Sequence, residues 1–227
     1  MTAIRLTRRT LFAGLFLAPL AIGSAGCTPG AIGRILGDSK KPPEYPLTPL
    51  KNRDTKEVRV VVFAATGPGM SYEFAGTDRD IAQQTAKKLA EATSKEKHPI
   101  KIIRPEDVER FKTSNTNWKV IHPSRVAQEL NADYIVDVSI TGIGLYQPGS
   151  GNVIYQGWAT ADVTVYEAGI ETPRYQYFHK SEQRPQAADT MPAGQYKAFL
   201  ISRLSEELAI RHMTHNEDSR VAPFDRR

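Results

Sequence analysis

The chain has 227 residues with 30 basic and 25 acidic side chains, a formal net charge of +5, and a single cysteine. One cysteine excludes an internal disulfide. Three of the basic residues lie in the first 26 positions, where no acidic residue occurs. The other 201 residues therefore carry 27 basic and 25 acidic side chains, a net charge of +2. Such a small charge gives no reason to expect a nucleic-acid partner.

The first 26 residues have the parts of an export signal. Arginines precede an apolar run from Leu11 to Ile22, and small residues follow it. The run has 12 residues, whereas a membrane-spanning helix needs roughly 20. We therefore predict a cleaved signal peptide over residues 1–26. The residues that define it most clearly are Arg8, Arg9, Ser24, Ala25 and Gly26.

The export route has two alternatives. Residues 7–12, Thr-Arg-Arg-Thr-Leu-Phe, resemble a twin-arginine motif, which would carry the protein across the membrane already folded. The same two arginines can instead supply the ordinary positive charge of a general secretory signal.

Cys27 follows the small residues directly and resembles the acylated cysteine of a bacterial lipoprotein, although Ser24 stands where leucine is usual. We predict that Cys27 is lipidated and becomes the first residue, which would use the thiol and anchor the protein. Secretion without lipid and an uncleaved anchor are the alternatives. Thr28, which is not the aspartate that retains some lipoproteins at the inner membrane, favours the outer membrane.

Residues 27–56 are predicted to be the lipidated cysteine and a tether. Five prolines lie between residues 29 and 49, among glycine, lysine and aspartate. This composition favours an extended, partly polyproline-II chain. Fully extended at ~3.1 Å per residue, the tether would reach about 90 Å.

The globular domain is predicted over residues 57–215. A continuous apolar run at 58–64 predicts a buried central strand. A helix is expected to begin after Thr77 or Asp78 and to run to about residue 92. A short strand at 100–103, a short helix from Pro105 and a polar loop over 112–118 follow.

The second half of the domain is predicted to be an antiparallel section and a last helix. A helix over 123–130 is followed by Asn131, which tolerates the left-handed conformation. Alternating strands are expected at 134–141, 155–165 and 174–180. A helix over 192–212 has an apolar stripe that must pack on the sheet. We predict that residues 216–227 are disordered.

This order, β-α-β-α-β-β-β-α, predicts an α/β (α+β) domain with one mixed sheet and helices packed mainly on one face. The opening strand at 60–63, the segment Ile-Ile-Arg-Pro at 102–105 and the segment at 127–136 resemble a family of envelope lipoprotein domains. That family includes the curli-secretion channel lipoproteins, the penicillin-binding-protein activator lipoproteins and the amino-terminal domain of the TolB protein. The resemblance implies a non-catalytic periplasmic adaptor or assembly factor.

Few residues suggest chemistry. Asp137 and Asp162 are expected to face each other on adjacent strands as a carboxylate pair, surrounded by Ser and Thr. His212 and His215 are three residues apart and could reach one metal ion, but no third ligand has a defined place nearby. We therefore predict no catalytic residue, no metal and no cofactor.

The sequence thus leaves two functional hypotheses. The first is a lipid-anchored, non-enzymatic binding, assembly or transport module that contacts an envelope protein through aromatic residues of loops and sheet edges. These candidate contacts are Trp118, Tyr146, Tyr155 and Trp158. The alternative is an exported enzyme or small-ligand-binding protein that uses the face with Asp137 and Asp162. The expected partners are the membrane and an envelope protein, with a second copy of the chain left open.

Overall fold

The computed structural model describes residues 40–50, 57–68, 70–94, 98–184 and 191–216. The predicted signal, Cys27, the first part of the tether and residues 217–227 lie outside the described residues. Within the described part of the chain, no helix is both long and apolar enough to cross a bilayer.

The core of the domain is a five-stranded mixed sheet in the order β3-β2-β4-β5-β6. Three neighbouring strands are parallel: β3 (Ile100–Ile102), β2 (Val58–Thr66) and β4 (Tyr134–Tyr146). Two antiparallel strands follow, β5 (Tyr155–Glu167) and β6 (Tyr175–Gln183). The predicted fold class and order of elements are confirmed.

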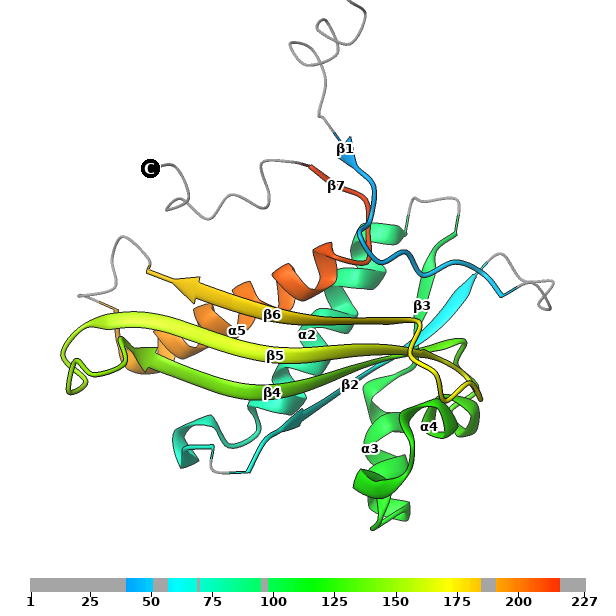
Figure 1. Ribbon diagram of the computed structural model, residues 1–227, viewed down its shortest axis with the longest axis horizontal. Helices are drawn as coiled ribbons and strands as arrows, with labels where there is room; N and C mark the ends of the chain where they lie inside the picture. The colour runs from blue at the N-terminus through cyan, green and yellow to red at the C-terminus, as the bar shows by residue number, and fades with distance from the viewer. Residues whose placement is uncertain (1–39, 51–56, 69, 95–97, 185–190, 217–227) are drawn as a thin grey trace, which may run out of the picture. The chain divides into compact units, whose positions relative to one another are not determined.

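Two long helices cover one face of the sheet, α2 (Thr77–Thr93) and α5 (Ala193–Ile210), as Figure 1 shows. Alternate residues of the strands point toward them, because successive side chains of a strand lie on opposite faces. The fully buried members of this core include Val60, Tyr134, Val138, Ala161, Val163, Leu200 and Leu204.

Two shorter helices lie against the opposite face, α3 (Pro105–Ser114) and α4 (Pro123–Glu129). A second hydrophobic cluster forms there from the other set of strand residues, including Val61, Phe63 and Ile135. We expected helices mainly on one face, so this packing adds a layer at one end of the other face. On the same face, the outward residues of β6, among them Phe178, are exposed, whereas those of β5 are mostly half-buried apart from the exposed Asp162.

The helix ends and strand ends differ from the prediction in places. The N-cap of α2 is Gly76 at φ 78°, where glycine has no steric cost, and not Thr77 or Asp78. Asn131 adopts φ 53°, which confirms the expected left-handed turn after α4. The segment predicted as loop at 112–118 instead continues α3 to Ser114 and leads into a short 3-10 helix, η2 (Trp118–Val120).

Strand β4 runs five residues beyond the predicted end at Thr141. Its register shifts at two points, between Ile140 and Gly142 and again before Tyr146. The ring of Trp158 lies against Gly142 and Gly144, where a Cβ atom would approach it to 2.7 and 2.6 Å. The two glycines therefore make room for the tryptophan.

Part of the predicted tether is packed on the domain. Residues 42–50, called the N-terminal strap below, cross the ends of β6 and α5. The ring of Tyr45 stacks on Tyr177 with 4.4 Å between ring centroids, and Leu47 is 7% exposed. The carbonyl oxygen of Tyr45 accepts a hydrogen bond from Nδ1 of the buried His212 at 2.9 Å. Just before the strap, β1 (Lys40–Lys41) pairs with β7 (His215–Asn216).

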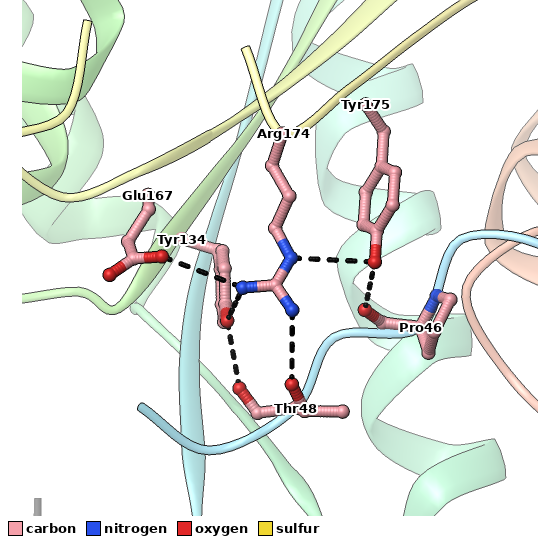
Figure 2. A network of polar contacts seen from close by, with 6 residues as sticks. All are labelled: Pro46, Thr48, Tyr134, Glu167, Arg174 and Tyr175. Atoms are coloured by element: carbon pink, nitrogen blue, oxygen red, sulfur yellow. Dashed lines mark hydrogen bonds and ion pairs between the residues drawn. The ribbon is translucent and has the colours of Figure 1, made fainter. Parts of the chain in front are cut away.

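Arg174 holds the second half of the strap, as Figure 2 shows. Its guanidinium donates to the hydroxyl of Tyr134 at 2.8 Å and to Oγ1 of Thr48 at 3.3 Å, and lies 3.5 Å from a carboxylate oxygen of Glu167. The hydroxyl of Tyr134 donates in turn to the carbonyl oxygen of Thr48 at 2.9 Å. The strap is thus connected to strands that lie more than 80 residues away in the sequence.

Candidate functional site

A cleft of about 400 Å³ opens on the second face of the sheet, between strands β2 and β4 and the segment from η2 to the start of α4. Its lining combines aromatic rings with a carboxylate, an imidazole, an ammonium and hydroxyl groups. The residues that carry these groups are Phe63, Trp118, Lys119, His122, Asp137, Ser139 and Tyr166. A cleft of this size falls within the range of roughly 300–1,000 Å³ found for small-ligand sites.

Local sequence fixes the place of several of these side chains in their own elements. Asp137 is an outward residue of β4, and its neighbours Val136 and Val138 point into the main core. Pro123 occupies the first position of α4, where a missing N–H is harmless, and this fixes the preceding residue His122 at the helix N-cap. The side chain of Trp118 packs edge-on against Phe63 at 5.3 Å between centroids.

The ring of His122 has a defined tautomer. Its Nδ1 accepts a hydrogen bond from the backbone N–H of Ser124 at 3.3 Å and lies 2.8 Å from the hydroxyl of the same residue. Because an accepting Nδ1 carries no proton, the proton of the neutral ring sits on Nε2. The ring also meets Tyr166 edge-on at 4.9 Å. His122 therefore offers a single N–H donor, and its orientation is set by contacts on both sides.

Asp137 is the unusual group of the cleft. Within the described residues, no side chain or backbone N–H donates a hydrogen bond to its carboxylate. Burial raises the pKa of Asp137 from 3.8 to about 6, and the nearby His122 only partly opposes this rise. Burial also raises the pKa of Tyr166, with Asp137 as a second cause. The carboxylate is therefore poorly solvated and can accept hydrogen bonds from a bound molecule.

The aromatic rings beside the cleft attract cations. The ammonium of Lys112 lies 4.7 Å from the ring centre of Phe63 and 5.0 Å from that of Trp118. The exposed Lys119 places its ammonium 5.5 Å from the ring centre of Trp118. Such contacts are typical of cation–π interactions, in which the electron-rich ring face attracts positive charge.

The predicted pairing of Asp137 with Asp162 is wrong. In the observed register Asp137 lies opposite Thr164, and Asp162 lies opposite Ser139. The two carboxylates share a face but are diagonal neighbours, and their surroundings differ. Asp137 lines the cleft, whereas Asp162 is exposed and does not. The alternation of the strands fixes the face, but the register depends on the hairpin and its bulges.

The four aromatic residues predicted as partner contacts all make contacts within the domain. Trp118 lines the cleft. Tyr146 and Tyr155 pack against each other at 4.7 Å near the end of the β4–β5 hairpin. The indole N–H of Trp158 donates to the carbonyl oxygen of Tyr146 at 3.1 Å. All four are partly buried, and their role toward a partner stays a prediction.

His212 does not point toward a metal site. Its Nδ1 donates to the carbonyl oxygen of Tyr45, and its Nε2 accepts from the hydroxyl of Tyr177 at 3.1 Å. Both ring nitrogens are therefore used. The side chain of His215 lies outside the described residues. Among the side chains that the structure describes, no group of three or more His, Cys, Asp or Glu is placed to hold a metal ion.

The aromatic and polar residues of the cleft that were not predicted as site residues include Phe63, Lys119, His122, Ser139 and Tyr166. A histidine directly before Pro123 at a helix start was a signal for an N-cap. Nothing local linked that histidine to Tyr166, because the two are 44 positions apart and meet only once α4 packs beside β5.

No family model matches the chain, and no curated protein matches it. Among solved structures, it is similar to lipoprotein GNA1162 from Neisseria meningitidis, with 14% identity and a TM-score of 0.40, over 67% of this chain and 97% of that one. It is also similar to the PelC dodecamer from Paraburkholderia phytofirmans, with 10% identity and a TM-score of 0.40, over 68% of this chain and 88% of that one. A third is the hypothetical protein CT253 from Chlamydia trachomatis, with 17% identity and a TM-score of 0.34, over 67% of this chain and 95% of that one.

At these TM-scores the similarities do not show a family or a function for this chain. They also do not show the resemblance to the curli-secretion, penicillin-binding-protein activator and TolB domains that the sequence suggested. The class that the fold and site define is an α/β domain with one mixed sheet, a partly uncovered sheet face and a cleft of ligand size.

Proposed function

We propose that the protein is a bacterial envelope lipoprotein, anchored through Cys27, whose domain is a non-catalytic binding or assembly module. The position of Cys27 supports the anchor, because it directly follows an apolar run of 12 residues and four small residues. The proposal places the domain on the periplasmic side of a membrane, with the outer membrane favoured by Thr28.

The observation that carries the binding role is the uncovered part of the second sheet face. Helices α3 and α4 cover only one end of it, and the outward residues of β6 are exposed. Phe178 is 59% exposed there, opposite Asp162 and two residues from Lys180. An exposed aromatic ring within a polar surface is typical of a protein contact. The proposed partner surface therefore lies on β6, whereas the aromatic residues suggested by the sequence are half-buried.

Replacing Cys27 by serine tests the anchor. Since serine has no thiol to acylate, Cys27→Ser is expected to move the protein entirely from the membrane fraction to the soluble fraction. The measurement is fractionation of cells together with the intact mass of the membrane-extracted wild-type protein. Gly30→Ala is the matched control, because it lies just after the predicted cleavage site and keeps the thiol. A wild-type mass that does not begin at an acylated Cys27 would contradict the anchor.

Cross-linking at Phe178 tests the partner surface. A photo-reactive phenylalanine analogue at this position is expected to give one discrete adduct with an envelope protein in living cells. The control is the same analogue at Tyr72, which is 94% exposed but lies in the 3-10 helix Tyr72–Phe74, away from β6. Equal adducts at both positions, or none at Phe178, would argue against a partner surface on β6. An adduct with a second copy of the chain would instead identify a homo-oligomer.

A further inference from the structure

We propose that the cleft between β4 and the η2–α4 segment binds a small organic ammonium compound, whose N–H groups donate to the carboxylate of Asp137. This site is separate from the proposed partner surface on β6, and it does not depend on whether Cys27 carries lipid.

The carboxylate of Asp137 is the group of the cleft that most needs a hydrogen-bond donor. Asp137 lines the cleft and is partly buried, and within the described residues it receives no hydrogen bond. A desolvated carboxylate without donors is unfavourable for the fold, and a bound ammonium would supply both charge and hydrogen bonds. The poor solvation of the carboxylate is also the main reason why the pKa of Asp137 is raised.

The walls of the cleft are largely aromatic. Phe63, Trp118 and Tyr166 supply aromatic surface around the carboxylate. Rings and a carboxylate together suit an ammonium attached to an apolar body, since the rings attract the cation and cover the carbon atoms. The ammonium of Lys112, which does not line this cleft, lies 4.7 Å from the ring centre of Phe63 and 5.0 Å from that of Trp118, so both rings already attract a cation from outside it.

The other charged groups set the limits of the proposal. Lys119 lines the cleft from η2, but it is exposed and lies over Trp118. His122 presents one N–H donor from the start of α4, and a hydroxyl or acidic group of the ligand could accept from it. An anionic ligand would meet the ionised Asp137 at neutral pH, so the charge favours an amine over an acid.

Three probes of similar shape separate the alternatives: phenethylamine, the neutral 2-phenylethanol and the anionic 3-phenylpropanoate. Binding to the full-length protein in detergent is measured by ligand-observed NMR at pH 7.5. Phenethylamine is expected to bind at least about ten-fold more tightly than 2-phenylethanol, because only the amine forms a charge-assisted hydrogen bond with the carboxylate. The anionic probe is expected not to bind.

Asp137→Asn is expected to remove the preference for the amine, and Asp162→Asn is the matched control that should keep it. Asp162 is on the same sheet face and carries the same charge, but it does not line the cleft. Melting curves show whether each variant is folded. Because Asp137→Asn removes the unfavourable free energy of a poorly solvated carboxylate, this variant should be no less stable than the wild type.

Several results would overturn the proposal. Equal binding of amine and alcohol would show that the cleft recognises apolar shape only, and tighter binding of the acid would show an anion site. No binding of phenethylamine at millimolar concentration, or a preference that survives Asp137→Asn, would also reject the ammonium site.

Discussion

A chain that begins at Glu57, and so lacks the N-terminal strap, is expected to be less stable than the longer chain by about 4 kcal/mol. The estimate combines the burial of Leu47, the stacking of Tyr45 on Tyr177 and the hydrogen bonds that Thr48 makes with Tyr134 and Arg174. The loss is large because the strap covers side chains that would otherwise face water.

Urea unfolding of two truncated chains measures this effect. One begins at Glu57, and the control begins at Lys41 and keeps the strap. Because truncation also uncovers His212, the shorter chain is expected to lose the acid sensitivity described next. If the two chains unfold at the same urea concentration, residues 42–50 do not stabilise the domain.

Two buried groups are expected to give opposite pH dependences of stability between pH 7 and pH 4. Burial lowers the pKa of His212 from 6.5 to about 4, while burial raises that of Asp137 from 3.8 to about 6. Each shift corresponds to about 3 kcal/mol between the folded and unfolded states.

The signs follow from which state binds the proton. Below pH 6.5 the unfolded chain protonates His212 and the folded chain does not, so stability falls as the pH drops toward 4. Asp137 takes up its proton in the folded state first, so its contribution improves as the pH drops through 6 toward 3.8. In the wild-type protein these two contributions should nearly cancel.

Single variants should separate the two contributions. Asp137→Asn is expected to be more stable than the wild type by about 3 kcal/mol at pH 7, and to lose this advantage by pH 4. His212→Gln keeps only the Asp137 contribution, so its free energy of unfolding is expected to rise as the pH drops from 7 to 4. The measurement is urea unfolding at several pH values, and other titrating groups are common to all three proteins. Parallel curves for the three proteins would contradict both assignments.

The sequence predicted the sheet well where strands have strong local patterns. The apolar run at 58–64 and the alternation from Tyr134 to Thr141 became β2 and most of β4. The continuation of β4 was missed, because Gly142 and Gly144 are poor strand formers. Their place in the strand depends on Trp158, which lies on the next strand and could not be matched to them from local pattern alone.

The candidate site was predicted in part. Asp137 and Trp118 were named, but the cleft that they share was not, because its other residues, including Phe63, His122 and Tyr166, come from separate segments of the chain. The sequence predicted that the strap belongs to an extended tether, because proline content indicates which backbone conformation a segment favours but not whether the segment packs on the domain. Tyr45 meets Tyr177 across 132 positions, which composition does not reveal.

The packing of the strap also limits how far the domain could lie from a membrane. Residues 27–56 as a free tether would reach about 90 Å, but the described chain joins the domain near Lys40. Lys40 lies thirteen positions after Cys27. Even a fully extended chain covers at most ~3.5 Å per residue, or about 45 Å in total, whatever its conformation. A lipid on Cys27 would therefore keep Lys40, where the chain pairs with β7, within about 45 Å of the bilayer surface, which is half the reach of the free tether. A partner of the anchored domain would have to lie within that shorter distance of the membrane.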